Sequence, residues 1–280
     1  MRKSHKPISF WIGRSLLYVM LIGSSILMVI PFYWSLATSL KLEQFVYASP
    51  PQWWPSPISI SSYIHVLTGI NFGHFFLNSI FVAAMVTAGH VFFDTLAAYA
   101  FAKLVFPGRD KIFFLFLLGL MVPFQVNLIP MYKIMALFHW VDSLAALIIP
   151  SLTSVVGIFL IRQFMKSIPD EILDSARMDG CGEFGVFWRI VFPLCTPGIA
   201  TLVIFTFMNS WNDFLWPRIV LNSSELFTLP LGLSQLQVKY TSNESQIMAG
   251  TVLTALPMIL VFLLAQRRFI EGMTAGAVKQ

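Results

Sequence analysis

The sequence has very little charge. Only 11% of its 280 residues are Asp, Glu, Lys or Arg, whereas 57% are hydrophobic, and a typical soluble domain has about 25% charged residues. The mean hydropathy is +0.76. A surface exposed to water requires more charge than this, so a soluble globular protein is excluded and a lipid bilayer is the expected solvent.

Motifs for several kinds of chemistry are also missing. Lys never follows Gly in the chain, so there is no Gly-x-x-x-x-Gly-Lys-Ser/Thr loop for ATP. His-Glu-x-x-His and Gly-x-Ser-x-Gly are absent as well. The two cysteines, Cys181 and Cys195, lack the spacing of metal ligands, and the five histidines are scattered. We therefore expect no enzymatic activity, no metal site and no cofactor bound by this chain.

Long apolar runs divide the chain into segments that could cross a bilayer. The hydrocarbon core is about 30 Å thick and requires about 20 apolar residues per helix. Backbone polar groups must be paired inside lipid, so each run is predicted to be helical. The sequence predicts an all-α integral membrane protein in which residues 1–280 form a single transmembrane domain. The six expected spans are 16–38, 75–101, 112–132, 143–165, 197–218 and 247–265.

The basic residues predict the orientation. If the N-terminus faces the cytoplasm, only Lys41, Lys133, Arg218 and Lys239 of the 18 Lys and Arg residues fall on the outer side. The other fourteen fall on inner segments, as the positive-inside rule requires. The first apolar run, 15–40, is longer than the hydrophobic region of a signal peptide, so we expect an uncleaved span. Both termini are therefore predicted to be cytoplasmic.

The inner segment 166–196 is the most charged stretch, and it predicts two short helices. Ser167–Asp170 has the Ser-x-x-Asp form of a capping box, and the acidic residues that follow favour a helix N-terminus. Gly180 suits the C-terminal cap of this helix. A second helix is expected over 183–191 and should end at Pro193.

The first of these helices is amphipathic. Ile172, Leu173 and Ala176 lie on one side of it. An amphipathic helix between two spans requires a surface to contact, either the membrane or a groove on a soluble partner. Helices that bind membrane surfaces usually have a strongly basic polar face, whereas this helix begins with acidic residues. A protein partner is therefore the favoured interpretation.

The same segment resembles the EAA loop of ABC importer permeases, whose pattern is Glu-Ala-Ala, three residues, Gly, nine residues and Ile-x-Leu-Pro. Here Asp174-Ser175-Ala176 is followed by Gly180 and by Ile190-Val191-Phe192-Pro193 at the same spacing. Asp174, Ser175 and Phe192 depart from the pattern. Segments 101–109, 211–217 and 266–279 resemble the carbohydrate-uptake branch of these permeases, and within it the MalG type.

The resemblance implies a type I importer permease fold with a coupling helix that docks on a separate cytoplasmic ATPase. It assigns this coupling to Glu171, Asp174, Ser175, Ala176, Arg177, Asp179, Gly180, Ile190 and Pro193. It also implies a second permease subunit, usually non-identical, a dimer of ATPase subunits that bind ATP and Mg²⁺, and an extracytoplasmic binding protein that delivers a sugar. The location would be a bacterial or archaeal cytoplasmic membrane.

Two sets of polar residues within the spans have alternative interpretations. Asp94 lies in the second span, where an acidic residue is costly and usually functional. It either pairs with a polar group on a neighbouring helix or takes part in transport. Gln125 and Asn127 in the third span could line a solute pathway, but hydrogen bonding between helices explains them equally well.

A third polar set lies near the outer half of the fifth span. Its members are Asn209, Trp211, Asn212, Asp213 and Trp216. These residue types suit a sugar, which is held by hydrogen bonds and by stacking on aromatic rings. Helical spacing would place Asn209, Asn212 and Trp216 on one face. The alternative is that the tryptophans anchor the helix at the membrane interface.

Other functions stay open at this point. A self-contained polytopic protein, such as a membrane enzyme, would require paired carboxylates, a His cluster or a Ser/Lys pair at one depth, and none is apparent. An ABC permease for phosphate, amino acids or peptides would share the EAA loop, but the tail and the Trp-Asn-Asp-Phe-Leu-Trp-Pro segment favour carbohydrate. A homodimeric permease is a further alternative.

Overall fold

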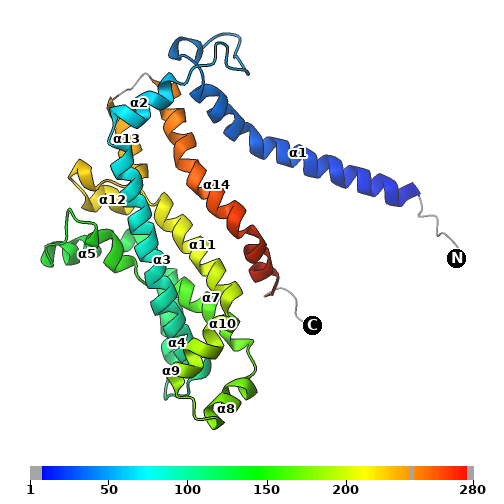
Figure 1. Cartoon of the computed structure of the whole chain (residues 1–280), viewed down its shortest axis with the longest axis vertical. Helices are drawn as coiled ribbons and strands as arrows, with labels where there is room; N and C mark the ends of the chain where they lie inside the picture. The colour runs from blue at the N-terminus through cyan, green and yellow to red at the C-terminus, as the bar shows by residue number, and fades with distance from the viewer. Residues whose placement is uncertain (1–7, 240–242, 276–280) are drawn as a thin grey trace. The chain divides into compact units, whose positions relative to one another are not determined.

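The computed structural model describes residues 8–239 and 243–275, so the basic residues at positions 2–6 and the tail beyond 275 lie outside the described part. Every regular element described is a helix (Figure 1). The α-helices are α1 (Ile8–Ser39), α2 (Ser61–Gly69), α3 (Phe72–Lys103), α4 (Arg109–Leu118), α5 (Phe124–Leu137), α6 (Ala145–Ile148), α7 (Val155–Lys166), α8 (Asp170–Met178), α9 (Glu183–Val186), α10 (Phe192–Leu194), α11 (Thr196–Asn212), α12 (Leu215–Val220), α13 (Leu229–Lys239) and α14 (Glu244–Ala275). Single turns of tighter or wider helix are η1 (Glu43–Phe45), η2 (Gly119–Met121), η3 (Ile149–Ser151), the π-helical η4 (Phe187–Val191) and η5 (Ser224–Leu226).

The described helices form two compact units. The first contains the chain up to Ile70 together with Leu236–Leu253, and the second contains the remainder. In the first unit, the carboxylate of Glu43 accepts hydrogen bonds from the backbone nitrogens of Glu244 (2.9 Å) and Ser245 (3.0 Å). Glu43 thereby satisfies backbone donors where α14 begins. The most apolar window of α1 buries no residue within the chain, which suits a helix that faces lipid or another subunit.

Each expected span has a counterpart among these helices. Four segments are long and apolar enough to cross a membrane: Gly13–Ser39, Phe72–Lys103, Ala145–Lys166 and Glu244–Leu264. The third of them is not one continuous helix, because Ser154 is extended between η3 and α7. Two further candidates are pairs of helices joined at a bend, of 101° between Arg109–Met121 and Phe124–Leu137 and of 78° between Glu183–Leu194 and Thr196–Asn212. The described chain therefore has six candidate spans when each bent pair counts as one.

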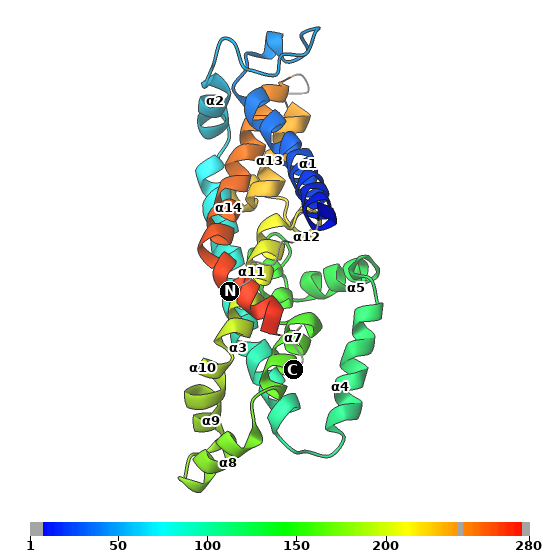
Figure 2. The same cartoon turned by 90° about the vertical axis from the view of Figure 1, so that its right-hand side faces the viewer.

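The expected span 112–132 is not a continuous helix. Val122 and Pro123 adopt extended backbone conformations, with ψ of 113° and 138°. A residue that precedes proline disfavours the helical conformation, so α4 with η2 ends at Met121 and α5 starts in a new direction. Figure 2 shows the two helices meeting at this corner. The span predicted over 112–132 is therefore made of two helices that meet at a bend.

Three long helices, α3, α7 and α11, pack side by side at the centre of the second unit (Figures 1 and 2). Their close approach depends on small residues: a Cβ atom on Gly198 of α11 would lie 2.6 Å from the ring of Phe164 on α7. At the end of α3 that carries Lys103, these helices share a buried apolar cluster with α4, α8 and α9. This cluster supports the segment that carries the EAA-like sequence.

Candidate functional site

The helix α8 is fixed at its start by a residue of a membrane-spanning helix. Nζ of Lys103, at the end of α3, donates to Oδ1 of Asp170 (2.6 Å) and to the carbonyl of Ile168 (2.6 Å). This hydrogen bond from Lys103 lowers the pKa of Asp170. The hydroxyl of Ser167 donates back to the carbonyl of Phe164 (2.7 Å) and caps nothing in α8. The predicted Ser-x-x-Asp capping box is therefore wrong.

The predicted glycine cap at the end of α8 is confirmed. Gly180 has a φ of +84°, in the left-handed region that glycine adopts without strain. The nitrogen of Cys181 donates to the carbonyl of Ala176 (3.0 Å), and the nitrogen of Gly180 donates to that of Arg177 (3.0 Å). This pair of bonds is a Schellman motif, which satisfies the last carbonyls of the helix.

The apolar residues of α8 divide between two environments. Leu173 is 1% exposed and belongs to the buried cluster, and Ala176 packs partly against the same cluster. Ile172 was expected to share their side but is exposed, and Met178 at the end of the helix is 87% exposed. The helix is thus attached to its own chain by Leu173 and presents other apolar side chains outward.

A charged network joins α8 to the next helix and to α3. Arg177 donates to Asp174 (2.8 Å) and to Oε1 of Glu183 (2.8 Å). Oε2 of Glu183 accepts a hydrogen bond from the hydroxyl of Tyr99 on α3 (2.5 Å). Glu183 was not identified as a site residue from the sequence. An acidic residue at the start of the expected second helix is favoured by the helix dipole, and this position could have drawn attention to it.

The second helix extends beyond its predicted end. The run α9–η4–α10 continues from Glu183 to Leu194, so it passes through Pro193 and bends at Cys195. Ile190 is half-buried. The other residues assigned to ATPase coupling, Glu171, Ser175, Asp179 and Pro193, are exposed.

Residues 180–185 have the Gly-x-Gly-x-x-Gly spacing of a dinucleotide-binding turn. That motif requires a preceding strand. Here the segment follows helix α8, so this interpretation lacks its structural context.

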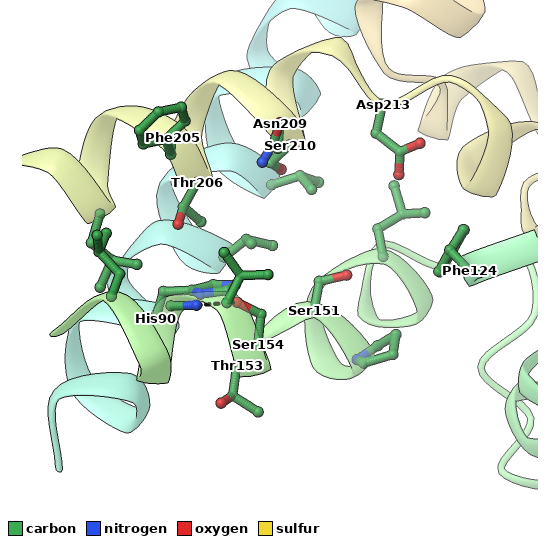
Figure 3. Close-up of a pocket in the computed structure, with 18 of the residues that line it drawn as sticks. His90, Phe124, Ser151, Thr153, Ser154, Phe205, Thr206, Asn209, Ser210 and Asp213 are labelled. Atoms are coloured by element: carbon green, nitrogen blue, oxygen red, sulfur yellow. Dashed lines mark hydrogen bonds between the residues drawn. The ribbon is translucent and has the colours of Figure 1, made fainter. Parts of the chain in front are cut away.

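A cavity of about 890 Å³ lies among the central helices of the second unit (Figure 3). Helices α3, α7 and α11 contribute most of its wall, and single residues come from α5, α6 and α12. Two of the predicted pathway residues, Asn209 and Asp213, line it. The others do not. Gln125 and Asn127 on α5 are exposed and lie outside its lining, and Asn212 is exposed and donates to the carbonyl of Met208 (2.9 Å).

Both tryptophans of this set are buried as packing residues. The indole nitrogen of Trp211 donates to the carbonyl of Thr254 (3.2 Å), and that of Trp216 donates to the carbonyl of Ala146 (2.9 Å). The predicted common face is wrong because α11 ends at Asn212. Asp213 is extended, with a ψ of 124°, and α12 begins after it.

Asp94 is fully buried and pairs with polar groups on α3 and on the segment that precedes α7. Its Oδ2 lies 2.6 Å from Nδ1 of His90, and its Oδ1 accepts from the hydroxyl of Thr153 (2.6 Å) and the backbone nitrogen of Ser154 (3.1 Å). The hydroxyl of Ser154 in turn accepts from the nitrogen of Gly157 and caps α7 (3.0 Å). The carboxylate therefore stabilises the point where α7 begins, whichever further role it has.

Within the described ranges, no group of three or more His, Cys, Asp or Glu residues is arranged to hold a metal ion. Cys181 and Cys195 are both free, and Cys195 is buried.

Residues 95–274 match the protein family described as binding-protein-dependent transport system inner membrane component. The arabinooligosaccharides transport system permease protein AraQ of Bacillus subtilis (strain 168) is 42% identical over 227 residues, which cover 80% of each chain. The sn-glycerol-3-phosphate transport system permease protein UgpE of Yersinia pestis is 34% identical over 264 residues, which cover 91% of this chain and 94% of that one. The sulfoquinovosyl glycerol transport system permease protein SmoH of Agrobacterium fabrum is 32% identical over 276 residues, which cover 97% and 96%.

The fold is also that of a solved importer. The crystal structure of a bacterial ABC transporter involved in the import of the acidic polysaccharide alginate contains a chain with a TM-score of 0.86 at 22% identity, covering 95% of this chain and 100% of that chain. The chain thus belongs to the family of binding-protein-dependent transport system inner membrane components, as a multi-pass permease of the carbohydrate-uptake type whose ATPase is a separate subunit.

Proposed function

We propose that this permease forms one half of the pathway for an uncharged saccharide and that α8 couples it to the ATPase. The observation that carries the coupling role is the attachment of α8. Leu173 and the Lys103–Asp170 hydrogen bond fix the helix to the membrane-spanning helices, while Met178 is left exposed. A partner that moved α8 would therefore move α3 with it.

The full assembly in this proposal has the partners that the family pattern implies. A second, non-identical permease completes the pathway, and a dimer of ATPase subunits binds ATP and Mg²⁺ on the side of α8. An extracytoplasmic binding protein delivers the solute on the opposite side. The distribution of basic residues supports placing α8 and both termini in the cytoplasm, since the segment 166–196 has several of them.

The coupling surface in this proposal consists of the residues that follow the EAA-like pattern. They are Glu171, Asp174, Ser175, Ala176, Arg177, Asp179, Gly180, Ile190 and Pro193. Arg177 and Asp174 are linked to each other and to Glu183, so we add Glu183 to this set.

The chemistry of the cavity supports an uncharged, hydroxyl-rich solute. Its wall is mostly apolar and is interrupted by hydroxyl and amide groups, among them Ser151, Thr206, Asn209 and Ser210. None of the described residues in its wall is Lys or Arg, and the acidic residue in that wall is Asp213. An anionic solute would meet no compensating positive charge here. Arabinooligosaccharides, named for one relative, are uncharged, whereas sn-glycerol 3-phosphate, named for another, is an anion.

Reconstituted transport tests this proposal. The permease, its second permease, the ATPase and the binding protein are placed in proteoliposomes, and uptake of labelled arabinotriose, maltotriose and raffinose is compared with uptake of sn-glycerol 3-phosphate. We expect uptake of at least one uncharged saccharide that depends on ATP and on the binding protein. Uptake of the anion alone would overturn the solute class, and the absence of any ATP-dependent uptake would overturn the pathway role.

A further inference from the structure

His90 has one ring nitrogen committed to a buried partner. It lies on α3, one helical turn before Asp94, and is 7% exposed. Its Nδ1 is 2.6 Å from Oδ2 of Asp94. The other carboxylate oxygen of Asp94 already accepts from Thr153 and Ser154. Two donors already point at this side chain, so Asp94 is the acceptor of the group and Nδ1 of His90 is the donor in the short contact.

The second ring nitrogen of His90, Nε2, is without a hydrogen-bond partner in the part of the chain that the structure describes. His90 forms part of the cavity wall (Figure 3). With the proton on Nδ1, Nε2 of a neutral imidazole is a hydrogen-bond acceptor. The carboxylate also fixes the orientation of the ring, as second partners of functional histidines commonly do.

We propose that His90 is a solute-contacting residue, whose Nε2 accepts a hydrogen bond from one hydroxyl of the saccharide, and that Asp94 is the residue that positions it. The proposal rests on the solute pathway proposed above, and it adds a specific contact on α3. A sugar hydroxyl is a suitable donor, since it can donate to Nε2 and still accept from a neighbouring group.

The opposite side of the cavity offers groups that could complete the contact. Thr206 and Asn209 come from α11, which lies across the cavity from His90 in Figure 3. A solute between α3 and α11 could therefore bond with His90 on one side and with a hydroxyl or amide on the other. Because Asp94 also stabilises the start of α7, this contact would join three helices of the pathway.

The test uses a variant that keeps the contact made by Nδ1 of His90 and removes Nε2. In His90→Asn, the side-chain amide reaches the position of Nδ1 and can still donate to Asp94, but nothing occupies the position of Nε2. Importers with the native chain and with His90→Asn are reconstituted with the same binding protein. Uptake is measured for the transported saccharide from the panel above and for its monodeoxy derivatives. His65→Asn is the matched control, since His65 is exposed on α2 and bonds through Nδ1 to the carbonyl of Ser61 (2.8 Å).

For each importer, discrimination is the ratio of uptake of the parent saccharide to uptake of a monodeoxy derivative. For one derivative, we expect this ratio to be about fivefold larger in the native importer than in His90→Asn, which is the effect of one neutral hydrogen bond. The binding protein is common to both measurements, so its own preference cancels in this comparison. His65→Asn should discriminate as the native importer does. Equal discrimination by the native and His90→Asn importers across the whole series would overturn the contact and leave His90 with a structural role.

A second measurement does not depend on a substituted chain. In the native importer labelled with ¹⁵N-histidine, entry of the transported saccharide should shift the Nε2 resonance of His90. An unchanged resonance in an importer that transports the sugar would also overturn the contact. If the native importer takes up no saccharide from the panel, the proposed function itself fails, and that outcome is distinct from either of these.

Discussion

Lys103, the last residue of α3, donates a 2.6 Å hydrogen bond to the carboxylate of Asp170, the first residue of α8. The side chain of Lys103 is almost completely buried, whereas that of Asp170 is mostly exposed. A helix that crosses the membrane is thus bonded directly to the helix that we propose docks on the ATPase. Any displacement of α8 must break this bond or move the end of α3.

Removing the negative charge of Asp170 from this contact should weaken it and reduce coupling. We expect Asp170→Asn to assemble normally, because Asp170 is exposed, and to hydrolyse more ATP per solute transported than the native importer. The loss in stability should be about 1–3 kcal/mol, because the almost completely buried ammonium of Lys103 loses its charged partner. The ratio of ATP hydrolysis to uptake in proteoliposomes is the measurement. Glu225→Gln, which neutralises an exposed carboxylate in η5, is the control and should leave the ratio unchanged.

The same bond should be insensitive to pH in the neutral range. The hydrogen bond from Lys103 lowers the pKa of Asp170, so the contact is present above the ordinary aspartate pKa of about 3.9 and is lost only as the pH falls through the lowered value. Spin labels at Val105 and Met178, both highly exposed, report the distance between the end of α3 and the end of α8. We expect one distance distribution between pH 8 and pH 5. A broadening near pH 6 would contradict the assignment.

Gly180 should be required for coupling and not for assembly. Its φ of +84° is unfavourable for any residue with a Cβ, by about 1–2 kcal/mol, yet a Cβ atom there would meet nothing within 4 Å. We expect Gly180→Val to change the end of α8, to assemble with its partners and to hydrolyse ATP without matching uptake. Gly182→Val is the matched control, since Gly182 has an ordinary φ of −70° and open space around it. Equal uptake by the two variants would refute this role.

Gly157 should be required for stability. A Cβ atom at this position would overlap Oδ2 of Asp94, which is fixed by its own hydrogen bonds. We expect Gly157→Ala to lower the free energy of unfolding by about 1–3 kcal/mol, the usual cost of overpacking. Gly73→Ala is the control, because nothing lies within 4 Å of a Cβ atom there. Thermal unfolding in detergent should separate the two variants, and similar midpoints would show that Asp94 can move aside.

Local signals in the sequence predicted local structure correctly. The cap at Gly180 was predicted correctly because it ends a helix of only nine residues, and all the groups that form the cap are close to it in the sequence. The capping box at Ser167 failed because a distant residue competes: Lys103 lies 67 positions from Asp170 and takes its carboxylate. Composition predicted the apolar spans, but hydropathy does not show the corner at Val122 and Pro123, which comes from the extended backbone that proline favours in the residue before it.

The candidate pathway was predicted only in part, because contacts with residues distant in the sequence decide which side chains reach the cavity. Trp211 and Trp216 have side chains that suit a sugar, but bonds to Thr254 and Ala146, far along the chain, bury them. Asn209 and Asp213 do reach the cavity. His90 was missed because a lone histidine in an apolar span has no distinctive pattern. Its spacing of four residues from Asp94 is the signal that could have identified it, since such pairs face each other on a helix.

Photo-crosslinking from α8 tests the central claim most directly. A photoreactive phenylalanine analogue replaces Met178, which is 87% exposed at the end of α8, and for comparison it replaces Phe138, an exposed residue in the loop after α5. The complete importer is irradiated, and the adducts are identified by mass spectrometry. We predict an adduct with the ATPase from position 178 and none from position 138. An importer that retains its ATPase but gives no ATPase adduct from position 178 would contradict the coupling role of α8.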